Sequence, residues 1–214
     1  EKNNIFFATA HVFLFASYLQ NFSQLLPDVS KIKSIQFEWI DPEGETRYGE
    51  QKQYDASVPV FMDCLPHVLS IIESCVPLSS HKLKKLIFNK GGADLKIEII
   101  AEEIKYDIKL ERNGVERRRV LIVQTDETYQ LDFSKEPGMI THRNNNNNAD
   151  PTWNTTQKPL TALLNAFLSS SAGGQLDERL NSNIGLKINE ITDEISSLYN
   201  ASLFSWLEEK FRQP

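Results

Sequence analysis

Apolar residues in the first part of the chain switch between the spacing of strands and the spacing of helices. Residues 4–10 form a short apolar run that is typical of a buried strand, and residues 12–26 carry apolar side chains at helical spacing. Residues 32–40 alternate in a way that predicts a strand with one better buried face. Residues 58–75 return to helical spacing. The pattern therefore predicts strand, helix, strand and helix.

The second part of the chain predicts a series of strands followed by helices. Residues 82–134 contain five alternating segments, and Asn113-Gly114 between two of them favours a tight hairpin. Residues 142–153 include five consecutive asparagines and show no periodicity, which predicts an exposed, flexible loop. Helical spacing then returns in residues 159–170, 184–199 and 202–211.

This order of elements predicts an α+β fold in which helices pack on one face of a largely antiparallel open sheet. A length of 214 residues is compatible with one domain that covers residues 1–214. The other face of the sheet then lacks a cover. If it carries Ile, Leu, Val or Tyr side chains, it would suit a partner domain or a second copy of the chain.

Composition and charge exclude several classes of protein. The net charge of −6 leaves no basic excess for binding nucleic acid, and the one basic cluster, residues 117–119, is interpreted as a solvated strand edge. No apolar run approaches the roughly 20 residues of a membrane span. Two cysteines, Cys64 and Cys75, are too few for a disulfide framework. A cytoplasmic protein without a nucleic-acid or membrane partner is expected.

Asp63 and His67 are the main candidates for chemistry, because they lie four residues apart on a predicted helix. A carboxylate at that spacing can orient an imidazole that exchanges a proton with a hydroxyl or carbonyl group. The alternative is structural: if Pro66 lies in the first helical turn, Asp63 is the N-cap and His67 faces solvent. His11 follows the first predicted strand and is a candidate for substrate binding, although a lone histidine beside Val12 and Phe13 is more often a packed, hydrogen-bonded residue.

Sequence signals for other chemistry are absent. Gly91-Gly92 and Gly173-Gly174 are isolated pairs without the strand, loop and helix of a dinucleotide-binding fingerprint. This chain alone is therefore not expected to bind NAD. The sequence contains no Gly-x-Ser-x-Gly motif and no cysteine or histidine cluster for zinc, so hydrolase chemistry and metal binding have no support.

Several segments resemble the C-terminal domain of the glucose-fructose oxidoreductase and inositol dehydrogenase family (Gfo/Idh/MocA). Residues 1–12, which include most of the segment NIFFATAHVF (residues 4–13), are similar to the last strand of the family's Rossmann domain. IKSIQFEWIDP is similar to a strand that comes after the next helix. PLTALLNAFLSSSAGG and LKINEITDEISSLYNAS are similar to its two late helices. The sharpest match is DCLPH, because the family places an Asp and a His four apart on this helix.

The resemblance implies the substrate-binding and assembly domain of an NAD(P)-dependent oxidoreductase that acts on a small molecule. His67 would then transfer a proton and Asp63 would orient it. The NAD(P) would be bound by a Rossmann domain supplied in cis or in trans, and the open sheet face would form a homo-oligomer. Leu65-Pro66 replaces a stretch that often contains glycine in the family, and the family's Glu-Lys-Pro motif is absent. The alternative is a non-catalytic dimerisation or protein-interaction module derived from this domain.

Overall fold

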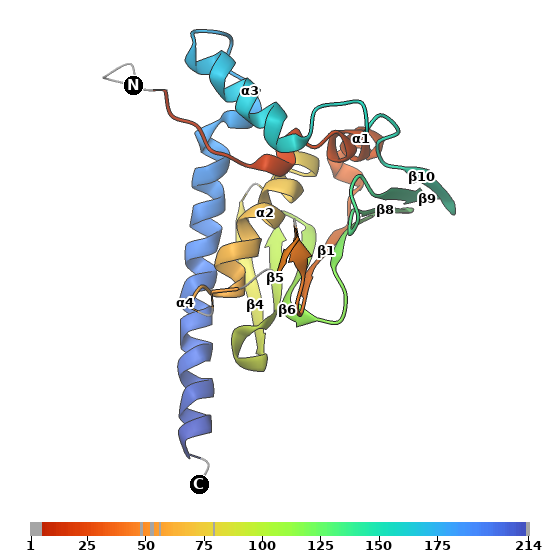
Figure 1. The fold of residues 1–214 in the computed structure, drawn as a ribbon. Helices are drawn as coiled ribbons and strands as arrows, with labels where there is room; N and C mark the ends of the chain where they lie inside the picture. Colours follow the sequence, from red (N-terminus) through yellow and green to blue (C-terminus); the bar gives the residue numbers. More distant parts are fainter. Residues whose placement is uncertain (1–5, 48, 52–53, 56, 79, 213–214) are drawn as a thin grey trace.

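An eight-stranded open sheet forms the centre of the structure, a computed structural model that describes residues 6–47, 49–51, 54–55, 57–78 and 80–212 (Figure 1). The strands of this sheet are β1 (Ser34–Pro42), β4 (His81–Asn89), β5 (Asp94–Ala101), β6 (Ile104–Gly114), β7 (Arg118–Gln124), β8 (Thr128–Asp132), β9 (Met139–His142) and β10 (Asn145–Asn148). They lie side by side in the order β10, β9, β8, β7, β1, β6, β5 and β4. A separate small hairpin consists of β2 (Thr46–Arg47) and β3 (Glu50–Gln51).

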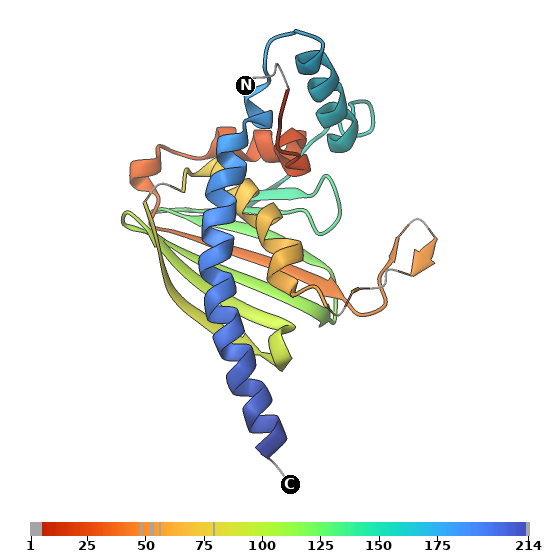
Figure 2. The same ribbon diagram turned by 90° about the vertical axis from the view of Figure 1, so that its left-hand side faces the viewer.

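Helices cover one face of this sheet. The α-helices are α1 (Ser17–Leu25), α2 (Val60–Cys75), α3 (Pro159–Ser171) and α4 (Ser182–Arg212), and the short 3-10 helices are η1 (Val12–Phe15), η2 (Val29–Lys31), η3 (Lys90–Gly92) and η4 (Glu178–Leu180). α2 and α4 lie side by side over the sheet, and the last turns of α4 extend beyond it (Figures 1 and 2). Among the described residues, no helix combines the length and apolar character needed to cross a membrane. The predicted α+β architecture is confirmed.

β1 occupies the middle of the sheet, where it pairs in parallel with β6 and antiparallel with β7. Trp39 of β1 lies opposite Leu110 on one side and Arg119 on the other. Parallel neighbours require a crossover connection, and α2 supplies the helical part of it before β4 and β5 lead back to β6. α2 therefore packs directly against β1 and β6, which places its candidate residues over the centre of the sheet.

The core lies between the sheet and the helices. Alternate residues of β1, namely Ile35, Phe37 and Trp39, are buried on the helix-covered face, as the alternation of this segment predicts. The apolar stripe of α2 packs onto them. Each fully buried apolar side chain of this kind contributes roughly 1.5–3 kcal/mol to stability. The residues that α2 and α4 bury in this core include Leu65, Val68, Leu69, Ile72, Ile188, Ile191 and Ile195.

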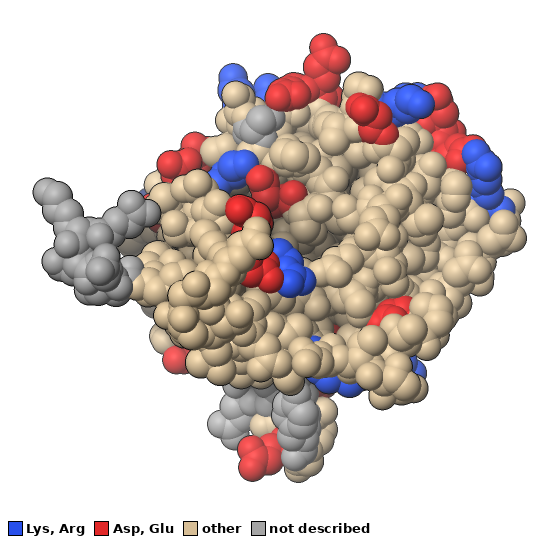
Figure 3. Space-filling model, turned by 90° about the horizontal axis from the view of Figure 1, so that it is seen from above, with Lys and Arg blue, Asp and Glu red and all other residues tan. Residues whose placement is uncertain are grey.

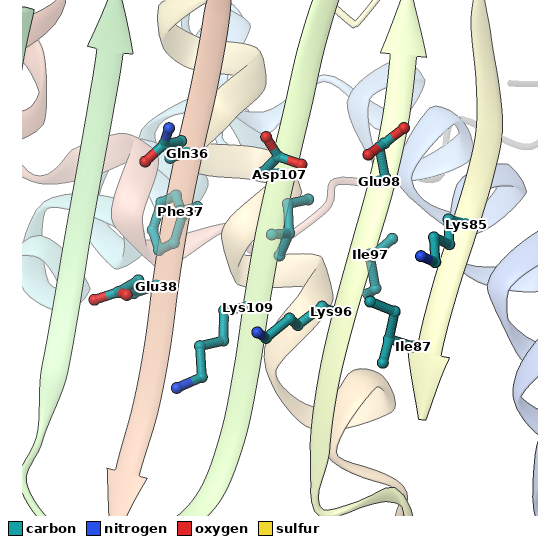
Figure 4. A pocket seen from close by; sticks show the side chains of 11 residues that line it. Gln36, Phe37, Glu38, Lys85, Ile87, Lys96, Ile97, Glu98, Asp107 and Lys109 are labelled. Carbon is teal, nitrogen blue, oxygen red and sulfur yellow. The ribbon is translucent and has the colours of Figure 1, made fainter. Parts of the chain in front are cut away.

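The opposite face of the sheet carries both charged and apolar side chains. Close to its centre, a groove of about 350 Å³ is lined by basic and acidic residues from β1, β4, β5 and β6 (Figure 4). Ile87 of β4, which lies opposite Lys96 of β5, adds an apolar side chain to this lining. This face therefore differs from a face of Ile, Leu, Val and Tyr side chains alone, because alternate residues of the neighbouring strands place charges of both signs there. The labelled charged side chains of Figure 4 are Glu38, Lys85, Lys96, Glu98, Asp107 and Lys109.

The N-terminal segment differs from the prediction of a strand. Residues 6–10 form no regular element, and the part of the predicted strand before residue 6 lies outside the described residues. The Thr9 backbone N–H donates to the carbonyl of Leu180, so this segment lies beside the end of η4 and does not join the sheet. The single helix predicted for residues 12–26 is divided at Ala16 into η1 and α1.

Two later segments are more regular than the sequence predicts. Four residues of the expected loop 142–153 form β10, the exposed edge strand, which follows a turn in which Arg143 and Asn144 both have positive φ. Two adjacent residues with positive φ are typical of the tight hairpin turn that matches strand twist. The two predicted C-terminal helices form one continuous helix, α4, because the sequence places no proline or glycine between Leu186 and Arg212.

Candidate functional site

The candidate residues Asp63 and His67 lie on α2, one helical turn apart. α2 begins at Val60 with Pro59 as its N-cap, so Pro66 lies inside the helix rather than in its first turn. The interpretation of Asp63 as an N-cap is therefore wrong. The predicted i,i+4 geometry is confirmed, and it gives a rise of about 6 Å between the two residues.

His67 is half-buried among aromatic rings. Its imidazole stacks on the indole of Trp39, with ring centroids 5.7 Å apart and an interplanar angle of 15°. Phe13 contacts the same imidazole edge to face, at a centroid distance of 5.4 Å and an angle of 77°. Phe13 comes from η1 and Trp39 from β1, so three separate segments converge here. The contacts fix the plane of the imidazole, as a proton-transferring group requires.

His11 lies near His67, which brings two of the three predicted site residues together. Burial, together with the charge that His67 carries when protonated, lowers the pKa of His11. Its imidazole is therefore mainly neutral near pH 7. The Nε2 atom of His11 is enclosed and has no hydrogen-bond partner among the described residues. A neutral imidazole nitrogen of this kind can donate to or accept from a polar group of a ligand.

Asp63 interacts with an arginine from the sheet. Nη2 of Arg112 donates to Oδ2 of Asp63 at 3.1 Å, and the Asp63 side chain is 43% exposed. Arg112 belongs to β6 and lies on the same face as Ile108 and Leu110, the face that packs against the helices. Its guanidinium therefore reaches α2 from the sheet. The same guanidinium donates to the carbonyl of Val58 at 2.6 Å. Arg112 therefore fixes both the Asp63 carboxylate and the chain that leads into α2.

A fully buried ion pair lies behind Trp39. The guanidinium of Arg119 lies over the indole of Trp39, 3.7 Å from the ring centroid, and forms an ion pair with Asp41. Both charged side chains are almost completely enclosed, and Arg119 also donates to the carbonyl of Ile40 at 2.7 Å. Burial lowers the pKa of Arg119, while the charge of Asp41 opposes this effect. His67 thus rests on an indole whose position is set by a buried, hydrogen-bonded charge pair.

The interpretation of residues 117–119 as a solvated strand edge is wrong for Arg119. Arg119 shares the buried face of β7 with Leu121 and Val123, since every second residue of a strand points the same way. That spacing of two was the signal in the sequence that could have identified it. The same reasoning applies to Asp41, which continues the buried series of β1 beyond Trp39.

Asp41, Asp63 and Cys64 form the only group of at least three potential metal ligands within the described parts of the chain. Their ligand atoms lie within 4.8 Å of one another, but each of the two carboxylates already has an arginine partner. Burial raises the pKa of the Cys64 thiol to about 12, with a further contribution from Asp41. A protonated thiol is a poor metal ligand. The donor set therefore does not suit a metal ion.

The chain's own glycine pairs do not fit a dinucleotide. Gly91-Gly92 belongs to η3, which joins the antiparallel strands β4 and β5. Gly173-Gly174 follows the C-terminal end of α3 rather than preceding a helix N-terminus. A pyrophosphate site needs a glycine-rich turn between a strand and the start of a helix. Neither pair provides it.

Comparison with known proteins identifies this fold in dehydrogenases. UDP-N-acetylglucosamine 3-dehydrogenase GnnA from Acidithiobacillus ferrooxidans superimposes with a TM-score of 0.72 and 14% identity, over 94% of this chain and 64% of that protein. The dehydrogenase MviM from Clostridium difficile gives 0.67 and 10%, over 92% and 63%. KijD10, a 3-ketoreductase from Actinomadura kijaniata in complex with TDP-benzene and NADP, gives 0.68 and 8%, over 90% and 61%.

These structures confirm the predicted resemblance to the C-terminal domain of Gfo/Idh/MocA-type dehydrogenases at the level of the fold. The chain spans less than two thirds of the length of each of the three proteins. No protein-family model matches the sequence, and no curated protein matches it.

Proposed function

We propose that this chain is the substrate-binding and assembly domain of an NAD(P)-dependent oxidoreductase that interconverts a hydroxyl and a carbonyl group on a small molecule. The main support is the geometry around His67, which is half-buried, oriented by Trp39 and Phe13, and close to His11. The fold is that of part of a 3-dehydrogenase and a 3-ketoreductase, and both names describe this type of reaction. That likeness favours the catalytic interpretation over a non-catalytic module.

In this proposal, the His67 imidazole accepts the proton of the substrate hydroxyl as it is oxidised, and returns it to the carbonyl oxygen in the reverse direction. NAD(P), bound by another domain, supplies the hydride chemistry. Asp63 orients His67 from one turn away, while Arg112 holds the carboxylate in place. The Nε2 atom of His11, which has no hydrogen-bond partner in the described part of the chain, binds a second oxygen of the substrate in this proposal.

An apolar surface at the upper end of the molecule supports a Rossmann partner domain. Leu160, Leu164 and Leu168 of α3 are 59%, 49% and 62% exposed, and Phe7 of the N-terminal segment is 74% exposed. Seen from above, most of this end of the molecule is formed by uncharged residues (Figure 3). Exposed apolar surface of this kind usually packs against a partner. The proposal assigns it to the Rossmann domain, in cis or in trans.

The open sheet face is proposed as a homo-oligomer contact. Lys85 and Lys96 have no ion-pair partner in the described residues, and acidic side chains such as Glu38 lie on the same face (Figure 4). A two-fold axis brings the same surface of two copies together, so opposite charges can meet across it. Such a contact would weaken as salt screens the charges, which sedimentation at two ionic strengths would detect. A cytoplasmic location completes the proposal, since both described cysteines are free.

The catalytic assignment is tested with His67→Ala in a protein that contains this chain and its dinucleotide-binding domain. The loss of a general acid or base should lower turnover roughly 10²–10⁴-fold, while the thermal midpoint changes little. His142→Ala is the matched control, because His142 stacks on Tyr129 and belongs to β9, which β7 and β8 separate from β1. Unchanged turnover in His67→Ala, or an equal loss in both variants, would contradict the assignment.

A further inference from the structure

A second cavity lies at the N-terminal end of α2, away from the rings around His67. It has a volume of about 400 Å³, within the range of small-molecule sites. Its wall is formed by the loop after β1, the segment that leads into α2, the start of α2, η3, the end of β6, and α4. Its lining residues are Gly44, Tyr54, Val58, Pro59, Val60, Gly91, Gly92, Ala93, Arg112, Asn113 and Tyr199.

Arg112 is the single charged residue among the described residues that line this cavity. It is 9% exposed, and its guanidinium has five N–H groups. Three of them donate, to the carbonyls of Asp55 and Val58 and to the Asp63 carboxylate. The Nε–H group is enclosed and has no acceptor among the described residues. A buried arginine with unused donors binds oxyanions well.

The charge of Arg112 is compensated less completely than that of Arg119. Arg119 pairs with a carboxylate as deeply buried as itself, whereas the carboxylate of Asp63 is 43% exposed to solvent. Water screens an exposed carboxylate, so it neutralises a buried cation less well. The cavity at Arg112 therefore keeps a positive character that the core around Arg119 does not have.

The other polar groups of the cavity are also suited to an anion. The hydroxyl of Tyr199 lies close enough to Arg112 for the guanidinium to act on its pKa, which burial raises. The N-terminus of α2 has no side-chain cap, and Val60 at this end lines the cavity. Uncapped N–H groups at a helix N-terminus favour negative charge. Residues with hydrogen-bond donors therefore line a space that has no acidic residue among its described lining residues.

We propose that this cavity binds the oxyanion group, a carboxylate or a phosphate, of the substrate. Val60, Asp63 and His67 follow one another at spacings of three and four, so they lie on the same side of α2. The distance along the helix from Val60 to His67 is about 10 Å. A substrate whose reacting carbon lies beside His67 would place its anionic group at Arg112 if about 10 Å separates that carbon from the anionic group. This inference rests on the proposed function and adds a substrate class to it.

The test measures anion binding to this chain directly, without cofactor or turnover. Inorganic phosphate and acetate are titrated separately while backbone amide and arginine Nε–H resonances are followed by NMR. We expect saturable shifts at Arg112, Val60, Gly92 and Asn113 with at least one probe, and the probe that binds more tightly identifies the anion. Arg112→Gln should weaken that binding at least about tenfold. Arg118→Gln, a charge change on the open sheet face, is the control and should leave it unchanged.

Arg112 also anchors the chain before α2, so Arg112→Gln could unfold the protein. Tyr199→Phe provides a second variant, since it removes one hydroxyl and keeps the ring contacts with Phe61 and Phe88. It should weaken binding of the same probe by a smaller factor. The inference is overturned if neither probe gives saturable shifts around the cavity, or if the shifts follow the lysines of the open face. His67→Ala should leave anion binding intact, so a failure of the catalytic proposal is distinguishable from a failure of this one.

Discussion

The buried pair of Arg119 and Asp41 gives the most direct test of the energetics of this fold. Asp41→Ala would remove the carboxylate that pairs with the enclosed Arg119 guanidinium, and would leave this cation beside backbone carbonyls and the indole of Trp39. Removal of one partner of a buried pair costs about 3–5 kcal/mol, because the remaining charge has lost its solvation and its counter-ion. That is a large part of the roughly 5–15 kcal/mol that stabilises a typical domain.

Replacement of both partners should cost much less than replacement of one. Asp41→Leu combined with Arg119→Met keeps a similar volume and leaves no charge inside the protein. Exchange of a buried pair for apolar residues is often neutral or stabilising. A double-mutant cycle on these two positions should therefore show a coupling free energy of at least about 2 kcal/mol.

Urea unfolding followed by circular dichroism measures these free energies. Lys33→Ala serves as the control, because Lys33 and Asp126 form a pair with side chains that are 64% and 95% exposed. We expect no measurable change in the unfolding midpoint for that variant. If Asp41→Ala is as stable as Lys33→Ala, or if the effects of the two core substitutions add, the buried pair does not hold Trp39 in place as described.

Two further predictions follow from other contacts. Gly92→Ala should destabilise the protein by about 1–3 kcal/mol in thermal unfolding. The φ of Gly92 is +92°, and an added Cβ would collide with the side chain of Tyr199. An unchanged unfolding midpoint would show that α4, which carries Tyr199, moves aside freely. Burial acts to raise the pKa of Asp150, but hydrogen bonds from Ser17 and Thr152 outweigh it and lower the pKa below 3.8. The stability that Asp150 contributes is present above its pKa in the unfolded chain and is lost as the pH falls through its lower pKa in the folded protein. Asp150→Asn should therefore lose less stability than wild type between about pH 6 and pH 3, as measured by urea titrations. Equal losses in the two proteins would exclude this contribution of Asp150.

The sheet could be predicted from the sequence wherever alternation determines which face is buried. Ile35, Phe37 and Trp39 repeat with a period of two, so β1 agrees with the prediction. The tight hairpin predicted at Asn113-Gly114 is wrong, because β6 and β7 do not pair with each other and β1 lies between them. β10 could not be predicted, because asparagine has little strand preference and the strand forms by pairing with β9 after a tight turn.

The candidate site was predicted only where local spacing contains the information. The spacing of Asp63 and His67 can be read from a single helical turn of the sequence, whereas their partners come from distant strands. Arg112 and Trp39 reach α2 through the register between β1 and β6, which single-sequence reasoning does not fix. The residues that enclose His67 and Asp63 therefore became identifiable only from the sheet order.

The position of β1 also governs how this chain can fold. β6 and β7 follow one another in the sequence but do not pair, because β1 lies between them. The strands β4 to β6 and β7 to β10 can each form from local hairpins, yet Ser34 must meet Lys105 across 71 residues (105 minus 34) before the two sets become one sheet. Contacts so distant in sequence form slowly. Until β1 is inserted, β6 and β7 each have an open edge, and this is the stage at which a nascent chain is most exposed to intermolecular strand pairing.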